Sequence, residues 1–295
     1  MGKRNPTSTD TPAGLGFAIT AYLLWGFLPS YMKALDHIGP LEIVAHRILW
    51  SVPIAAVLLV LLKRTGDLFD ALRSPRMLAM ACVTAALISL NWAIYVWAVV
   101  SERALEAALG YYVNPLFSIA LAFVLLGERP SALQWVAIAL AASAVALIAW
   151  ESGSLPLAAV GLMTTWGFYA LAKKQLPIGP NQGFLLEVLL LLPLALGYLI
   201  WLGAAGRFGG TLADTWLLIG CGAVTAIPLI LYANGAKRLR LSTISILQYI
   251  APTMIFLQAV FVFGEPFSGA RLIAFPMIWA ALVVYSIPMI QAMRR

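Results

Sequence analysis

Residues 109–130 read LGYYVNPLFSIALAFVLLGERP, and residues 247–266 read LQYIAPTMIFLQAVFVFGEP. Each stretch carries a proline inside a long apolar run, and each run closes with Gly-Glu. A proline in a helix interior removes a backbone hydrogen bond and would break a helix of a soluble protein. The same unusual pattern, written twice, indicates an internal repeat.

The amino-acid composition indicates the environment in which such apolar runs are stable. Hydrophobic residues make up 62% of the chain and charged residues 11%, against about 45–50% and 25% in soluble domains. Apolar runs of about 20 residues recur, each long enough to cross a bilayer core of about 30 Å. Backbone amides in lipid need internal partners, so these runs must be helices. The sequence predicts an all-α integral membrane protein with ten transmembrane helices, at 14–34, 41–62, 77–99, 104–126, 132–150, 155–172, 182–202, 214–235, 243–264 and 268–290.

The repeat extends over most of the chain. A shift of 137 residues aligns Pro115 with Pro252, and a shift of 141 aligns Trp25-Gly26-Phe27 with Trp166-Gly167-Phe168. We therefore predict two copies of a five-helix unit, at 14–150 and 155–290, with polar tails at 1–13 and 291–295. Because five is odd, the second copy starts on the opposite side of the membrane. Inverted repeats of this kind are typical of secondary transporters, whose substrate site lies near the midplane between the halves.

The repeated prolines and Gly-Glu pairs have separate interpretations. Pro115 and Pro252 each fall near the middle of a predicted span, where they permit a bend and are predicted hinges. The alternative is that prolines are simply common in membrane helices. Gly127-Glu128 and Gly264-Glu265 lie at helix ends, where Gly turns the chain and Glu favours the next helix N-terminus. We interpret both pairs as structural.

The net charge of +7 is unevenly distributed. If the N-terminus is cytoplasmic, fourteen basic residues fall on the inner side: Lys3, Arg4, Lys63, Arg64, Arg73, Arg76, Arg129, Lys173, Lys174, Lys237, Arg238, Arg240, Arg294 and Arg295. Four fall on the outer side, Lys33, Arg103, Arg207 and Arg271, and Arg47 lies within a span. This bias predicts that both termini are cytoplasmic. The basic excess therefore indicates orientation and contact with anionic lipid, and nucleic acid is not an expected partner.

These motifs resemble those of a known family. Ten helices in inverted halves, with LLGERP closing the fourth and FGEP the ninth, are similar to the EamA-type repeats of the drug/metabolite transporter (DMT) superfamily, and to its RarD-like permeases in particular. The resemblance rests on AYLLWGFLPSYMK, AHRILWS, LNWAIYVWAV, ALGYYVNPL, GERPSALQWVAIALA and RLRLSTISILQYIAPTM, and it covers about residues 14–290. It implies the EamA/DMT fold and an exporter of small metabolites in the bacterial inner membrane. RarD proteins commonly carry a chloramphenicol label, and related YddG-type carriers export aromatic and other amino acids.

A transported solute needs a cavity, and polar or aromatic residues inside spans are candidates to line it. We predict substrate contacts from Tyr22, Trp25, Asn91, Trp92, Tyr95, Tyr111, Tyr112, Asn114, Trp166, Tyr169, Tyr232, Asn234, Gln248 and Tyr249. The aromatics suit an amphipathic solute with an amine, through stacking and cation–π contacts. The alternative is that Trp and Tyr only form interfacial belts. The resemblance implies a cavity lined by both halves, with Trp166 at the family's helix-six aromatic position.

Three ionisable residues inside spans are predicted to have gating or charge roles. Arg47, beside His46, falls in the outer half, and Glu187 falls in the inner half, so we expect no direct pair between Arg47 and Glu187. Arg47 could attract a carboxylate, and Glu187 could carry a proton or meet an amine. In the alternative, Arg47 snorkels to the headgroups and Glu187 caps backbone groups or pairs with a lysine. Uniport and proton antiport both stay open.

Other function classes find less support. The sequence has no Walker motif, no His-Glu-x-x-His and no Gly-x-Ser-x-Gly, so neither an ATP-driven pump nor a membrane-embedded enzyme is favoured. No Cys/His cluster has metal-ligand spacing, and Cys82 and Cys221 are expected to be packing residues without a cofactor or metal. The prediction is a carrier of small amphipathic metabolites, amino acids first, with chloramphenicol-type drug efflux and then an enzyme as alternatives. A monomer suffices.

Overall fold

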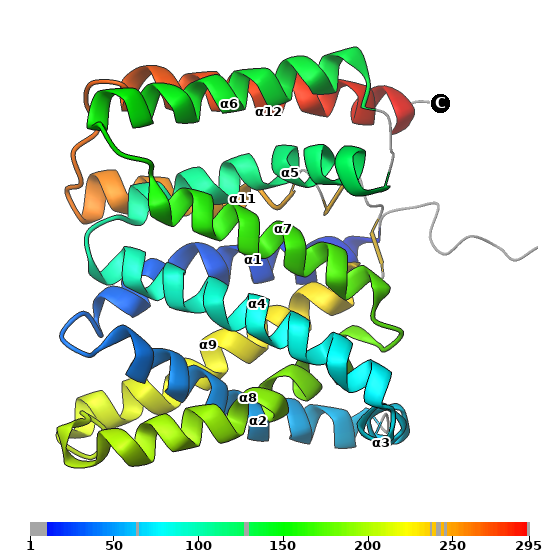
Figure 1. Cartoon of the computed structure of the whole chain (residues 1–295), viewed down its shortest axis with the longest axis vertical. Coiled ribbons are helices and arrows are strands. Elements are labelled where there is room, and N and C mark those ends of the chain that lie inside the picture. The colour runs from blue at the N-terminus through cyan, green and yellow to red at the C-terminus, as the bar shows by residue number, and fades with distance from the viewer. Residues whose placement is uncertain are drawn as a thin grey trace, which may run out of the picture.

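The computed structural model describes residues 11–62, 65–126, 130–236, 238–239, 243–244 and 247–293. Within these residues the regular secondary structure is helical (Figure 1), which confirms the predicted fold class. The helices are α1 (Pro12–Lys33), α2 (Pro40–Leu61), α3 (Gly66–Arg73), α4 (Pro75–Val100), α5 (Ala104–Leu126), α6 (Ala132–Ser152), α7 (Leu157–Gln175), α8 (Pro180–Leu202), the 3-10 turn η1 (Gly203–Ala205), α9 (Leu212–Ala236), α11 (Ile250–Leu257), the π-helix η2 (Gln258–Val262) and α12 (Arg271–Met293). Most of the predicted tail 1–13 and the pair Gly127-Glu128 lie outside the described residues.

A helix is present at each of the ten predicted spans. By length and composition, seven described helices can cross a membrane: α1, α2, α4, α5, α6, α8 and α9. The segments Ile250–Val262 and Arg271–Ile287 are shorter apolar helices, and α7 is less apolar because it carries Thr164, Thr165 and Lys173. Large apolar side chains face outward along the bundle, among them Leu194 and Ile200, which are 73% and 78% exposed. Such surfaces are stable in lipid, so the chain is a multi-pass membrane protein.

The helix pairings repeat when the two halves are exchanged. The residue shifts relate α1 to α7, α2 to α8, α4 to α9, α5 to α11 and α6 to α12. In the structure α1 packs on α9 and α11, and its counterpart α7 packs on α4 and α5. The pairs α2–α8, α5–α11 and α6–α12 map onto themselves. Two copies related by a two-fold axis produce this pattern.

The repeated Trp-Gly motif has a packing function. A Cβ at Gly26 would lie 2.5 Å from Met254 Sδ of α11, and a Cβ at Gly167 would lie 2.7 Å from the Phe117 ring of α5. These distances leave no room for a side chain. The glycines therefore permit the two equivalent contacts, α1 with α11 and α7 with α5.

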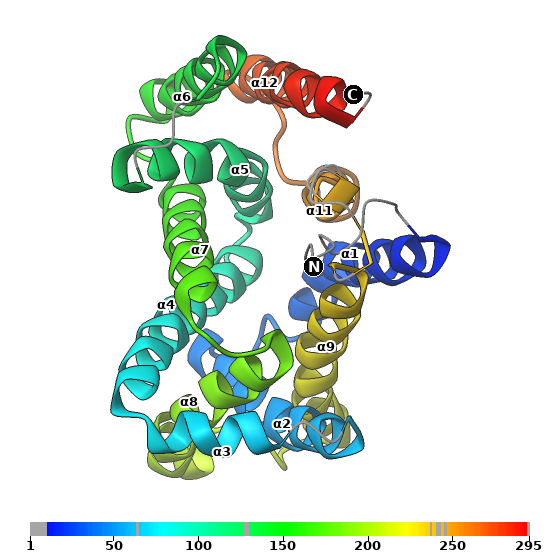
Figure 2. The ribbon, with the colours of Figure 1, turned by 90° about the vertical axis from the view of Figure 1, so that its right-hand side faces the viewer.

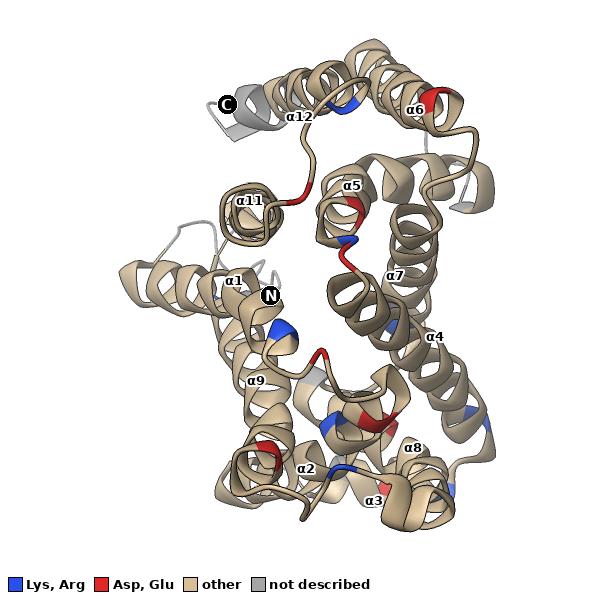
Figure 3. Ribbon diagram, turned by 90° about the vertical axis from the view of Figure 1, so that its left-hand side faces the viewer, with Lys and Arg blue, Asp and Glu red and all other residues tan. Residues whose placement is uncertain are grey.

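Viewed along the helices, the bundle forms a ring (Figure 2), with α4, α7 and α5 on one flank and α9, α1 and α11 on the other. Helices α6 and α12 close one end of the ring, and α2, α3 and α8 close the opposite end. Helix α1 begins and α12 ends on the same side of the bundle. Charged residues gather mainly near helix ends and loops (Figure 3), as expected where a chain leaves the hydrocarbon region.

The ninth span differs from its prediction. Within the described part of 243–264, α11 begins only at Ile250 and passes at Gln258 into the π-helix η2. Pro252 lies in the first turn of α11, whereas Pro115 lies inside α5 as predicted. The missing amide of Pro252 cannot bond to the turn formed by residues 248–249. The helix is therefore interrupted just before Pro252, and the hinge role of both prolines stays a prediction.

Two further features were not predicted. The short helix α3 occupies a connection that the sequence indicated as a loop, and it packs on α4 and α8. Gly264 turns the chain with a φ of 70°, as expected, but Glu265 does not serve the next helix. Its carboxylate accepts hydrogen bonds from the N–H groups of Ala104 (2.6 Å) and Leu105 (2.9 Å) at the start of α5. Glu151 instead bonds to Ala270 N, beside the start of α12.

Candidate functional site

A central cavity of about 190 Å³ lies between the two halves. It is lined by Tyr22, Trp25 and Leu28 of α1, Arg47 of α2, Ile88, Asn91, Trp92 and Tyr95 of α4, Tyr111 and Asn114 of α5, Trp166 and Tyr169 of α7, Phe184 of α8, Thr225, Leu229 and Tyr232 of α9, and Gln248, Ala251, Pro252 and Ile255 at α11. All but three of the predicted substrate contacts are in this list. The structure therefore brings them together, and their role in binding stays a prediction.

A second cavity, here called the vestibule, adjoins the first and has a volume of about 560 Å³. The two share Trp25, Trp166, Tyr169, Phe184, Leu229 and Tyr232, and the vestibule adds Ala55, Leu58, Ala170, Lys173, Asn181, Ile230 and Ala233. It is lined by the last turns of α2, α7 and α9 and the first turns of α8. These turns lie at the end of the bundle where α1 begins and α12 ends. The two cavities form one path from that end toward the centre.

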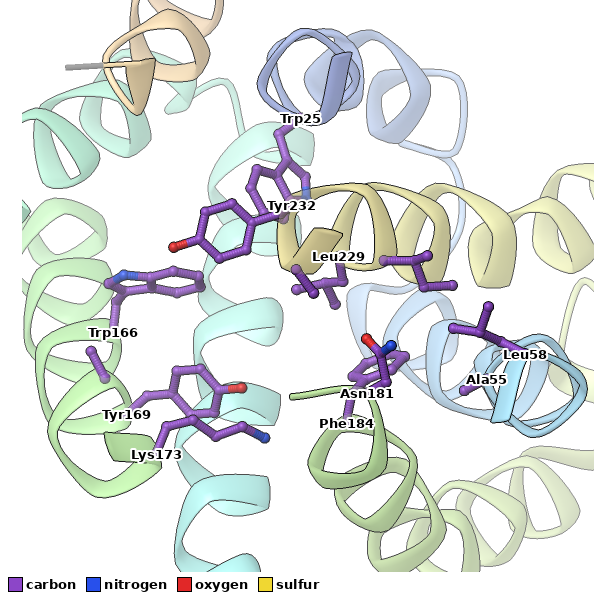
Figure 4. Close-up of a pocket in the computed structure, with 13 residues that line it drawn as sticks. Trp25, Ala55, Leu58, Trp166, Tyr169, Lys173, Asn181, Phe184, Leu229 and Tyr232 are labelled. Carbon is purple, nitrogen blue, oxygen red and sulfur yellow. The ribbon is translucent and has the colours of Figure 1, made fainter. Parts of the chain in front are cut away.

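Aromatic rings from both halves form the junction of the two cavities. The ring centroids of Tyr22 and Trp25 lie 5.6 Å apart, and those of Trp25 and Tyr232 also lie 5.6 Å apart. Opposite them, Trp166 and Tyr169 of α7 have centroids 5.7 Å apart. Figure 4 shows Trp25 and Tyr232 facing Trp166 and Tyr169 across the pocket. This arrangement offers apolar faces with a few polar tips to a solute.

Arg47 points into the central cavity and does not snorkel, because its side chain is only 3% exposed. Its Nε donates a hydrogen bond to Thr225 Oγ1 at 3.0 Å, and the Thr225 hydroxyl donates to Cys221 O at 2.7 Å. The guanidinium carbon lies 5.0 Å from the centroid of the Trp92 ring. Arg47 Nη1 is buried and has no hydrogen-bond partner. The Nε edge of the guanidinium is thus held by Thr225, and Nη1 is available to bind a solute.

The two asparagines of the cavity differ. Asn91 is occupied by the protein: its Nδ2 donates to Thr165 Oγ1 at 2.9 Å and to Leu162 O at 3.2 Å, which ties α4 to α7. Asn114 is 8% exposed, and its Oδ1 has no hydrogen-bond partner. Asn114 is therefore free to contact a solute, while Asn91 also holds the wall together.

Several predicted residues lie outside both cavities. Tyr112 donates to Thr253 Oγ1 at 2.8 Å in the seam between α5 and α11. Asn234 Nδ2 donates to Ile230 O of its own helix, and Tyr249, the repeat counterpart of Tyr112, lines neither cavity. His46 stacks on Phe208 with a centroid distance of 4.9 Å. The structure does not place these residues at the cavities, because a helix has several faces and a sequence does not say which one meets a cavity; their predicted roles stay predictions.

Glu187 is fully buried and has two partners. Lys173 Nζ lies 2.6 Å from its Oε1, and the Tyr169 hydroxyl donates to Oε2 at 3.2 Å. This is the lysine pairing left open by the sequence. As expected, Glu187 and Arg47 have separate partners. Lys173 and Tyr169 line the vestibule, whereas Glu187 lies behind them.

Some lining residues were missed by the sequence analysis. Thr225, which positions Arg47, lies in an apolar run, and no neighbouring residue in the sequence marks it as a functional position. Phe184 and Asn181 lie near the start of α8, and Lys173 had been counted only as an orientation signal. A signal existed for Lys173, since it stands one turn after Tyr169 on the same helical face.

The comparisons with known proteins show the family of the chain. The EamA-like transporter family matches residues 12–150. An uncharacterized transporter of Vibrio cholerae serotype O1 is 41% identical over 291 residues, which cover 97% of this chain and 96% of that protein. The chain belongs to the EamA-like transporter family. It is thus a member of the DMT superfamily, and a transporter rather than an enzyme.

Other relatives are similar over almost the same length. The protein RarD of Escherichia coli K12 is 37% identical over 97% of this chain and 98% of its own, so the chain is RarD-like. The chloramphenicol-sensitive protein RarD of Pseudomonas aeruginosa is 32% identical over 92% of each chain. A solved structure, described only as the crystal structure of a protein, shares the fold with a TM-score of 0.61 and 22% identity, covering 95% of this chain and 97% of that one.

Proposed function

We propose that this chain is a secondary transporter that exports amino acids of broad specificity across the bacterial inner membrane by alternating access. The units that move are the two halves, 14–150 and 155–290, with Pro115 and Pro252 as hinges. The solute binds in the central cavity. One chain contains the whole path, so a monomer suffices.

The observation that carries the proposal is the composition of the central cavity. Aromatic residues from both halves surround it, and its lining includes Arg47 and Asn114, each of which has a buried polar atom without a hydrogen-bond partner among the described residues. An amino acid has matching chemistry, namely an apolar body, an anionic group and a hydrogen-bond donor. The central cavity has a volume of about 190 Å³. This is below the roughly 300–1,000 Å³ of drug-sized sites, which favours a small metabolite as the solute.

Orientation follows from charge. The bias of Lys and Arg toward one side supports cytoplasmic termini. The vestibule lies at the end of the bundle where α1 begins and α12 ends, so it would exchange solute with the cytoplasm in this conformation. The proposed direction, export, rests on the resemblance to metabolite exporters.

Counterflow in liposomes tests the proposal. The purified protein is reconstituted, the vesicles are loaded with each of a panel of unlabelled amino acids, and entry of the radiolabelled form is followed. Saturable counterflow of at least one amino acid is expected, as a carrier requires. Flux that does not saturate indicates a channel, and the absence of flux for the whole panel rejects amino acids as the substrate class.

The same assay with an imposed pH gradient addresses coupling. Glu187 is the carboxylate inside a span that is paired with a lysine beside the path. Counterflow independent of the gradient supports uniport. Accumulation driven by the gradient supports proton antiport, with Glu187 and Lys173 as the groups to substitute first.

Chloramphenicol efflux is the second candidate. The printed name of the Pseudomonas aeruginosa relative includes sensitivity to chloramphenicol, and the aromatic lining would accept its ring. Against it, chloramphenicol is uncharged and would leave the buried guanidinium of Arg47 without a counter-ion. Including labelled chloramphenicol in the liposome panel separates the two candidates.

A further inference from the structure

We propose that the central cavity contains a carboxylate subsite, formed by the guanidinium of Arg47 and the hydroxyl of Tyr95, with Asn114 Oδ1 accepting a hydrogen bond from an amine of the same solute. This inference rests on the proposed function and refines it. It names the substrate class as small solutes with one carboxylate and one amine, held in a fixed orientation.

The position of Arg47 is the first step of the argument. Three helices converge on its side chain: α2 carries it, α9 binds its Nε through Thr225, and α4 places the Trp92 ring 5.0 Å from its guanidinium carbon. Thr225 is itself fixed by its bond to Cys221 O. Holding one edge of a planar guanidinium in this way orients the opposite edge, which suits carboxylate recognition. Nη1 is left as a buried donor without a partner.

Charge balance is the second step. The described residues that line the central cavity include no carboxylate, and Glu187 is already bound by Lys173 and Tyr169. Burial of an unpaired guanidinium is costly, and an anion in the cavity offsets that cost. The cavity therefore favours an anionic group next to Arg47.

The remaining polar atoms are the third step. Tyr95 stands three residues after Trp92 on α4, hence on the same helical face, and its hydroxyl is buried without a partner. It can donate to the anion that Arg47 attracts. Asn114 Oδ1, also unpartnered, is an acceptor and suits an ammonium. Most of the remaining lining is apolar or aromatic, which suits a hydrocarbon side chain.

Two matched series of ligands test the subsite without relying on transport. The first consists of phenylalanine, phenylalaninamide, phenethylamine and 3-phenylpropionate, and the second of the corresponding leucine compounds. Binding to the full chain in lipid nanodiscs is measured by tryptophan fluorescence. We expect the amino acids to bind at least tenfold more tightly than their amides and decarboxylated amines, because only the carboxylate reaches Arg47 as an anion.

Substitutions then assign this preference to residues. Arg47→Gln should bring the acid-to-amide ratio close to one, Arg47→Lys should reduce it, and Tyr95→Phe should reduce it a few-fold while leaving the fold intact. Asn114→Leu should instead weaken the amino acid relative to 3-phenylpropionate. The matched control is Arg103→Gln, since Arg103 also lies over a tryptophan, with 5.2 Å to the Trp97 ring, but on the surface.

Each outcome decides the question. Wild-type protein that binds amides as well as acids, or that binds no compound with a carboxylate, overturns the subsite. A ratio that Arg47→Lys and Tyr95→Phe leave unchanged overturns the assignment to these residues, even if Arg47→Gln fails to fold. A clear preference without liposome flux keeps the subsite and rejects the transport proposal. Liposome flux without a preference for the carboxylate keeps the transport proposal and rejects the subsite.

Discussion

At the scale of single residues, the two buried charges of the path are stabilised in different ways. Glu187 has its countercharge within the protein, at 2.6 Å, and a tyrosine hydroxyl in addition. Arg47 has a hydroxyl and an aromatic face but, among the described residues, no carboxylate partner. A buried ion that loses its partner is strongly destabilising. The first residue is therefore expected to matter for stability, and the second for ligand binding.

Replacing Lys173 with alanine should destabilise the protein by about 3–5 kcal/mol, because Glu187 would remain buried without its countercharge. The double variant Lys173→Met, Glu187→Leu should recover most of this loss, since it removes both charges at once. Thermal unfolding in detergent, followed by size exclusion, measures both effects. The control is Lys33→Ala, whose partners Asp36 and Glu102 are exposed and whose loss should cost under about 1 kcal/mol. Equal losses for Lys173→Ala and Lys33→Ala would contradict the argument.

The sequence alone predicted which residue types would line the cavity. It did not predict, for every residue, whether its side of the helix faces the cavity. Tyr95 and Tyr232 are repeat counterparts that both line it. Tyr112 and Tyr249, equally polar and equally repeated, do not. The difference is a rotation about the helix axis, which is fixed by packing against neighbours from the other half. The lipid-facing side and the core-facing side of each helix are both apolar. The sequence therefore shows little periodicity that would distinguish the buried face from the lipid-exposed face.

At the scale of the helices, close approach determines which pairs form. A Cβ at Gly222 would clash with the backbone carbonyl group of Trp50, so α9 touches the backbone of α2 at this point. Ten spans could be predicted from apolar runs, since length alone reveals them. The pairing of α2 with α9 could not, because a glycine within an apolar run does not say which helix it meets.

Gly222→Val should separate α2 from α9 and cost about 1–3 kcal/mol or more, because backbone atoms cannot move aside as side chains do. Gly197→Ala on α8 is the matched control. A Cβ there meets nothing within 4 Å, so a gain of roughly 0.5–1 kcal/mol is expected from the better helix former. Midpoints of thermal unfolding in the same detergent compare the two. A tolerated Gly222→Val would show that the contact is not tight.

Glu265 connects the halves through the start of α5, and its effect should depend on pH. Burial raises the pKa of its carboxyl above the ordinary value, and the bonds from Leu105 and Ala104 oppose that rise. The folded protein then binds the proton more tightly than the unfolded chain. This contribution to stability is therefore full below the ordinary glutamate pKa and is lost as pH rises through the folded value.

Wild type should accordingly lose melting temperature relative to Glu265→Gln as pH rises from about 4 to about 7. The amide of the variant keeps an acceptor oxygen but does not titrate. Glu102→Gln is the control, because that side chain is 79% exposed. A difference that grows in favour of wild type with rising pH would mean that the amide bonds outweigh burial.

At the scale of the whole molecule, the two-fold relation between the halves allows the other conformation to be inferred. The structure has a vestibule at one end, and exchange of the halves would form the equivalent vestibule at the opposite end. Its walls would come from the repeat counterparts of the present lining. Ala233, which lines the vestibule, corresponds to Val96, which is now fully buried. In the exchanged state Val96 should be accessible.

Single cysteines at these two positions test that inference in a Cys82→Ala, Cys221→Ala background. In vesicles of known sidedness that carry out counterflow, a membrane-impermeant maleimide should reach Ala233→Cys from the side where α1 begins and α12 ends. It should reach Val96→Cys only from the opposite side, and faster when solute drives exchange, because each turnover opens the second vestibule. Arg73→Cys and Glu102→Cys, both exposed, mark the two sides. Labelling of Val96→Cys from the same side as Ala233→Cys, or none during active exchange, would be incompatible with halves that trade conformations about a two-fold axis.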